Sequence, residues 1–137
     1  MITGIAHVNL TVPPGTLEVA AEFYAGVLGF TRVPVPVLQK DELAWFDILP
    51  GGQQIHISSR PTKPNAPDGT HHPCFKVESP EALLNLQGKI YESFERGGDH
   101  KPMTVDAPGE NSGAKGVEYP KRFFARDYAG NRLEFSL

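Results

Sequence analysis

GGQQIHIS (residues 51–58) and AGNRLEFS (residues 129–136) form an internal repeat, because they align with each other without a gap. Each has a glycine at its second position, apolar residues at its fifth and seventh positions, and a serine at its end. At the sixth position His56 stands opposite Glu134. Internal similarity of this kind indicates that one structural unit occurs twice in the chain.

The beginning of each unit repeats as well. HVNLTV (residues 7–12) aligns with HPCFKV (residues 72–77), which places His7 opposite His72. The first of these stretches alternates apolar and polar side chains, as a half-buried strand does, and we expect a strand in the second as well.

The segments between these strands complete two modules of the order β-α-β-β-β. Apolar residues at helical spacing predict helices over residues 17–28 and from Pro80 to the Gly97-Gly98 pair, with Thr16 and Ser79 as caps. Alternation and turn residues predict further strands at residues 30–38, 44–49, 54–58, 121–126 and 132–137. We therefore expect an α+β fold in a single domain of residues 1–137, with module one at 1–59, a proline-rich linker at 60–71 and module two at 72–137.

Composition excludes several functional classes. The chain has 137 residues, a formal net charge of −3 and one cysteine. The acidic balance argues against nucleic acid and anionic membrane surfaces as partners, and a single cysteine rules out an internal disulfide framework. No apolar run approaches the roughly 20 residues of a membrane span, and the start shows no signal peptide, so we expect a cytoplasmic protein.

The repeat gives four equivalent strands a potential metal ligand each. In the first and last strands of both units, His7, His56, His72 and Glu134 fall on the polar face, while the apolar residues point the other way. Three imidazoles and one carboxylate suit a divalent transition metal such as Zn, Ni, Co, Fe or Mn, rather than Ca or Mg. If the two sheets curl toward each other, the sequence predicts one metal site with positions open for substrate.

Other polar residues share these faces and are candidate substrate-binding residues. Asn9 and Gln54 would orient ligands or substrate, although ordinary hydrogen bonding within the strand is the alternative. Lys76 and Arg132 would balance substrate charge, with a role as surface cations equally open. Cys74 faces the same side, more as a small filler than as a nucleophile, because the spacing places no base beside it.

Five segments together resemble the vicinal oxygen chelate superfamily, which includes glyoxalase I, extradiol dioxygenases and bleomycin-resistance proteins. They are HVNLTV, AAEFYAGVLGF, GGQQIHIS, HPCFKV and DYAGNRLEF, in this order along nearly the whole chain. The resemblance implies a glyoxalase-like curled, eight-stranded mixed sheet around a cavity, and a homodimer. It also places the family's metal ligands on His7, His56, His72 and Glu134.

The resemblance implies a metal-dependent lyase or isomerase, similar to lactoylglutathione lyase, that chelates a small substrate through adjacent oxygens. Glu134 would be the catalytic residue, as both ligand and general base. The sequence departs from glyoxalase I and the epimerases at His56, where those enzymes usually have Glu or Gln.

Three alternatives remain open, because fold does not settle function. One is an Fe(II) extradiol-type dioxygenase that uses His7, His72 and Glu134, with His56 free as an acid–base residue. Another is a fosfomycin-type resistance enzyme with the same three ligands. The last is a metal-free protein that binds a drug, as bleomycin-resistance proteins do.

Overall fold

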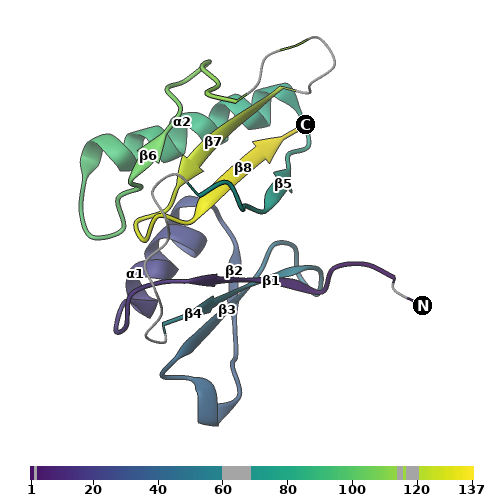
Figure 1. The fold of residues 1–137 in the computed structure, drawn as a ribbon, viewed down its shortest axis with the longest axis vertical. Coiled ribbons are helices and arrows are strands. Elements are labelled where there is room, and N and C mark those ends of the chain that lie inside the picture. The colour runs from purple at the N-terminus through teal and green to yellow at the C-terminus, as the bar shows by residue number, and fades with distance from the viewer. Residues whose placement is uncertain (2, 60–68, 114–115, 117–120) are drawn as a thin grey trace. The chain divides into compact units, whose positions relative to one another are not determined.

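A computed structural model describes residues 1, 3–59, 69–113, 116 and 121–137 of the chain (Figure 1). The chain divides into two compact units, Met1–Pro64 and Asn65–Leu137, and each is described by itself. Of the predicted linker, residues 60–68 lie outside the described residues.

The first unit contains one four-stranded sheet. Its strands are β1 (His7–Thr11), β2 (Thr31–Val33), β3 (Leu43–Asp47) and β4 (Gln54–Ser58). The order across the sheet is β1-β4-β3-β2, with β1 and β4 parallel and the other pairs antiparallel. The first and last strands of the unit are therefore direct neighbours.

The second unit repeats this topology. Its strands are β5 (Cys74–Lys76), β6 (Thr104–Val105), β7 (Arg122–Arg126) and β8 (Arg132–Ser136), in the order β5-β8-β7-β6. Again the first and last strands pair in parallel, and the other pairs are antiparallel. The predicted α+β class and the duplication are confirmed, in the form of two four-stranded mixed sheets.

The helices differ from each other in regularity. The helix of the first unit begins as α1 (Leu17–Ala21) and widens into the π-helix η1 (Glu22–Val27), in which the bulky neighbours Phe23 and Tyr24 are both buried. It ends at Gly29, whose φ of 81° is the left-handed conformation expected there. Of the strand predicted at 30–38, β2 forms the first part, residues 34–36 have no regular structure, and a short 3-10 helix, η2 (Val37–Gln39), covers the end.

Helix α2 (Pro80–Arg96) lies along the second sheet (Figure 1). Its start is as predicted, because the Ser79 hydroxyl accepts a hydrogen bond from the Ala82 N–H at 3.1 Å and proline occupies the first turn. Gly88 does not interrupt it. Thr16 is the N-cap residue of α1, as predicted, but its hydroxyl donates to the Pro13 carbonyl at 2.7 Å and makes no capping hydrogen bond to the helix.

Each sheet has one apolar and one polar face. The apolar faces hold the most buried side chains of the strands, Ala44, Phe46, Ile55, Ile57, Phe75, Phe123, Ala125, Leu133 and Phe135. Helical residues such as Phe23 and Ile90 are fully buried as well. Among the described residues, no helix is long and apolar enough to cross a membrane.

The turn between β7 and β8 is built around a buried carboxylate. Asp127, with 0% of its surface exposed, accepts hydrogen bonds from the backbone N–H groups of Ala129 and Asn131 and from the Asn131 side-chain amide, at 2.8 to 3.0 Å. Gly130 completes the turn with a φ of 85°. The DYAGN segment therefore sets the register of the strand that carries Glu134.

Replacing Asp127 by alanine leaves these three buried donors without their acceptor. We expect the free energy of unfolding to fall by about 3 kcal/mol, measured by urea denaturation. Asp99→Ala, at an exposed position, is the control and should stay within about 0.5 kcal/mol of the parent protein. Equal stabilities of the two variants would show that the turn does not depend on the carboxylate.

Candidate functional site

The first unit brings two of the predicted ligands together on the polar face of its sheet. In the parallel pair β1–β4, His56 lies opposite Asn9, and His7 stands two residues earlier on β1. Their imidazole rings stack, with centroids 3.9 Å apart and 9° between the ring planes. Asn9 shares this face, as the alternation predicted.

A second ring holds the other face of His56. Trp45 lies opposite His56 on β3, with ring centroids 4.4 Å apart and 7° between the planes. The imidazole is therefore sandwiched between Trp45 and His7. Partial burial, and then the neighbouring His7, lower the pKa of His56 below 6.5, because both disfavour its charged form.

Hydrogen bonds fix the edge of the same imidazole. The Asp47 carboxylate accepts from the Gln54 side-chain amide at 2.7 Å and from the Gly51 N–H at 3.0 Å. Both hydrogen bonds lower the pKa of Asp47, and the bond from Gln54 has the larger effect. Because the amide nitrogen of Gln54 faces Asp47, its oxygen faces the His56 Nε2 atom, 2.9 Å away. Nε2 thus donates, and Nδ1 carries the lone pair of neutral His56.

The second unit brings the other two predicted ligands together. The His72 Nε2 atom lies 2.8 Å from the Glu134 Oε2 atom. The other carboxylate oxygen of Glu134 accepts a hydrogen bond from the Arg122 guanidinium at 3.2 Å. Glu134 is buried, with 8% of its surface exposed. Its carboxylate contacts the Arg122 guanidinium and the His72 imidazole at the same time.

The two pairs occupy equivalent places in the repeat. Glu134 lies opposite Cys74, and His72 stands two residues before Cys74, just as His7 stands two residues before the partner of His56. In the part of the chain that the structure describes, neither unit alone gathers three His, Cys, Asp or Glu side chains that could hold a metal ion. Each unit thus brings two candidate ligands together.

The donor atoms of the second unit fit a transition metal. Two ligand atoms, each about 2.1 Å from one ion, are roughly 3 Å apart, close to the 2.8 Å between His72 and Glu134. The donor atoms of the first unit do not fit one metal ion in the same way. Parallel stacked rings cannot both aim an in-plane lone pair at one ion, so in this arrangement only His7 or His56 can serve as a ligand.

The predicted substrate-binding residues of the second unit share one face with Glu134. Arg132 and Lys76 lie on this face at strand positions two residues from Glu134 and Cys74. Partial burial first, and then Glu134, raise the pKa of the Cys74 thiol. The raised pKa disfavours the nucleophilic thiolate, and Cys74 is exposed rather than packed into the core.

Several residues of these faces were not predicted from the sequence. Arg122, the ion-pair partner of Glu134, alternates with Phe124 along KRFFAR, and this alternation was the available signal. Trp45, whose position in an apolar stretch gave no sign of a role at the polar face, is half-buried and stacked on His56. Nothing in the sequence indicated that Asp47 orients Gln54, because the contact depends on the pairing of β3 with β4.

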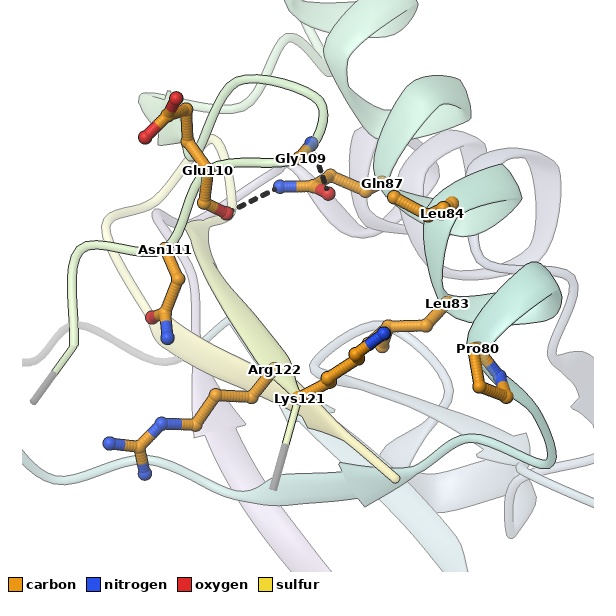
Figure 2. A pocket seen from close by; sticks show the side chains of 9 residues that line it. All are labelled: Pro80, Leu83, Leu84, Gln87, Gly109, Glu110, Asn111, Lys121 and Arg122. Atoms are coloured by element: carbon orange, nitrogen blue, oxygen red, sulfur yellow. Dashed lines mark hydrogen bonds between the residues drawn. The ribbon is translucent and has the colours of Figure 1, made fainter. Parts of the chain in front are cut away.

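The described part of the loop at residues 102–118 is fastened to α2 by one side chain. The buried amide of Gln87 donates to backbone carbonyls that include Glu110 and accepts from the Gly109 N–H (Figure 2). Farther along, a Cβ atom on Gly113 would lie 2.5 Å from the Phe124 ring, so only glycine fits there. The loop is thus held where it passes against Phe124.

A cavity of about 280 Å³ lies between α2, this loop and the start of β7 (Figure 2). Leu83 and Leu84 form its helical wall, and Lys121 and Arg122 form its strand side. None of the four predicted metal ligands lines it. The cavity therefore adjoins the polar face of the second sheet through Arg122, the partner of Glu134, without reaching the predicted ligands themselves.

The sequence matches one protein family over residues 4–135, described as the Glyoxalase/Bleomycin resistance protein/Dioxygenase superfamily. With the duplicated β-α-β-β-β topology, this match defines the class: the chain belongs to this superfamily, as the resemblance implied. No curated protein matches the chain.

Solved structures show the same fold. A protein assigned to the glyoxalase family from Bacillus anthracis is 26% identical, with a TM-score of 0.70 over 98% of this chain and 94% of that one. The fosfomycin resistance protein FosX from Listeria monocytogenes, complexed with Mn(II) and sulfate, gives 15% identity and a TM-score of 0.72 over 99% and 90%. Lactoylglutathione lyase from Agrobacterium tumefaciens gives 17% and 0.66 over 98% and 93%. At these low identities the last two likenesses establish the fold alone.

The lowered pKa of His56 predicts a pH dependence. In metal-free protein we expect its NMR titration midpoint below 6.5. The unfolded chain then binds more protons between the two pKa values, so the contribution of His56 to stability is complete above pH 6.5 and is lost as the pH falls through this window. A midpoint at or above 6.5 would contradict the sandwiched environment.

Proposed function

We propose that this protein is a divalent-metal-dependent enzyme of lyase or isomerase type, which binds a small oxygenated substrate through adjacent oxygens. One observation carries the proposal: each repeat brings its own two predicted ligands into contact, at equivalent positions on the polar face of equivalent sheets. A chance pair of polar residues in one unit has no reason to recur in the other. We also propose a homodimer, the assembly that the resemblance implies.

The metal would be held by His72 and Glu134 of the second unit together with His7 of the first. His56 is the remaining member of the predicted four-ligand set. Its stacked ring and its hydrogen bond to Gln54 favour a place beside the metal rather than on it. The metal identity stays within Zn, Ni, Co, Fe and Mn, and the Mn(II) complex of FosX supports that range.

Each residue of the site would have a definable role. A bound divalent metal supplies Lewis acidity for negative charge that develops on a substrate oxygen. Arg122 holds one oxygen of Glu134 and so steadies the carboxylate. Glu134 is the acid among the proposed ligands and would move a proton if it left the metal. The Nδ1 lone pair of His56 offers a second acceptor for a substrate proton.

The arrangement of His56 favours a second candidate function as well. With three ligands (His7, His72 and Glu134), the site resembles those of extradiol dioxygenases and fosfomycin-resistance enzymes. Anaerobic loading with Fe(II), followed by oxygen and a catechol, separates the two candidates. Ring cleavage would support the dioxygenase, and its absence would leave the lyase or isomerase proposal.

Metal titration of single variants tests the ligand set. We expect one ion per chain in the parent protein. For His72→Ala we expect the affinity to fall by more than about 100-fold, since loss of outer partners alone lowers it 10–100-fold. Glu134→Gln should bind metal weakly and lose turnover. His71→Ala, which removes the exposed neighbouring imidazole, is the matched control and should bind as the parent does.

His56→Ala decides between three and four ligands. Because His56 is held by Trp45, His7 and Gln54, we expect this variant to keep its metal affinity within a few-fold. A loss as large as that of His72→Ala would restore the four-ligand set. If the parent protein binds no metal and His7→Ala leaves ligand affinity unchanged, a metal-free binding protein is the correct description.

A further inference from the structure

The polar face of the second sheet carries more positive than negative charge, although the chain as a whole has a formal net charge of −3. Strand register places four cations on this face, Lys76, Arg122, Arg126 and Arg132. Among the described residues the carboxylates that accompany them are Glu134 and, directly after β6, Asp106. A divalent metal on Glu134 would increase the positive excess.

Several of these charges already have partners. Arg122 is bound to Glu134. The guanidinium of Arg126 donates to the backbone carbonyls of Gly130 and Gly69, at 2.9 and 2.7 Å. The Asp106 carboxylate accepts from two backbone N–H groups, including that of Phe124 at 2.8 Å. These contacts fix the loop and the sheet edge, and they leave Arg132 and Lys76 without a counter-charge among the described residues.

The side chain of Arg132 has a defined orientation. Its guanidinium lies over the Phe124 ring, 4.5 Å from the ring centroid. A cation–π contact orients the guanidinium plane but does not satisfy its N–H donors. In the part of the chain that the structure describes, no carboxylate pairs with it. The half-buried position of Arg132 thus combines a fixed orientation with unused charge.

We infer that this face binds an anionic substrate: a small oxygenated molecule with a carboxylate, phosphate or phosphonate group, which Arg132 contacts and Lys76 assists. Arginine suits this task because its planar fork matches the oxygens of such groups. Arg132 and Glu134 are two residues apart on one strand, so their backbone positions are about 7 Å apart. The anionic group of the substrate would therefore lie within a few covalent bonds of the substrate oxygens that bind the metal. The inference extends the proposed function.

Calorimetric titration with methylphosphonate and acetate tests this inference. The metal-free and Zn²⁺-loaded proteins would both be titrated, and uncharged ethylene glycol serves as the neutral probe. We expect an anion to bind and the glycol not to bind. Arg132→Gln should weaken anion binding by roughly tenfold or more, and Lys76→Gln by a few-fold. Arg96→Gln, at the end of α2, is the matched control and should bind as the parent protein does.

Arg132→Met preserves packing of the side-chain stem on Phe124, so it keeps the test valid if the glutamine variant folds poorly. Anion affinity that is unchanged in both Arg132 variants, or glycol binding as tight as anion binding, would overturn the inference. Metal content of each sample, measured separately, distinguishes this failure from failure of the proposed function. Metal binding without an Arg132-dependent anion site refutes the inference alone, and an anion site without metal binding refutes the catalytic proposal alone.

Discussion

The parallel pairing of the first and last strands within each unit is the constraint on which the site depends. In β1–β4 and β5–β8, this pairing lays the polar faces of two strands from opposite ends of a unit side by side. A shift of one residue would turn every ligand to the apolar face, because side chains alternate along a strand. The buried aliphatic and aromatic residues on the other face, such as Ile55 and Phe135, therefore hold the ligands in place.

Duplication has produced two pairs with different surroundings. The pair in the second unit is ionic: Glu134 lies between His72 and Arg122 on a face rich in cations. The pair in the first unit is aromatic, with His56 between two rings and its edge tied to Gln54. Equivalent positions in the two units thus have different chemical properties. In the proposed function the second unit would supply charge for a metal and an anion, and the first would supply the His56 imidazole, whose proton position is defined by Gln54.

The sequence predicted the repeat, the strand alternation and the capped start of α2, because these depend on local periodicity and on turn chemistry. It did not predict the π-helical turn at Phe23 and Tyr24, which arises where two bulky neighbours are buried together. Nor did it predict the contacts of Arg122 with Glu134 or of Asp47 with Gln54, since both join residues whose proximity depends on strand pairing. The joint metal site of the two units stays a prediction.

The structure of the protein with bound Mn(II), determined by crystallography with anomalous scattering, tests the central claim most directly. We predict one ion coordinated by the imidazoles of His7 and His72 and the carboxylate of Glu134, with His56 stacked on His7 and not bound to the ion. An ion bound elsewhere, or ligated by the residues of one unit without those of the other, would contradict it.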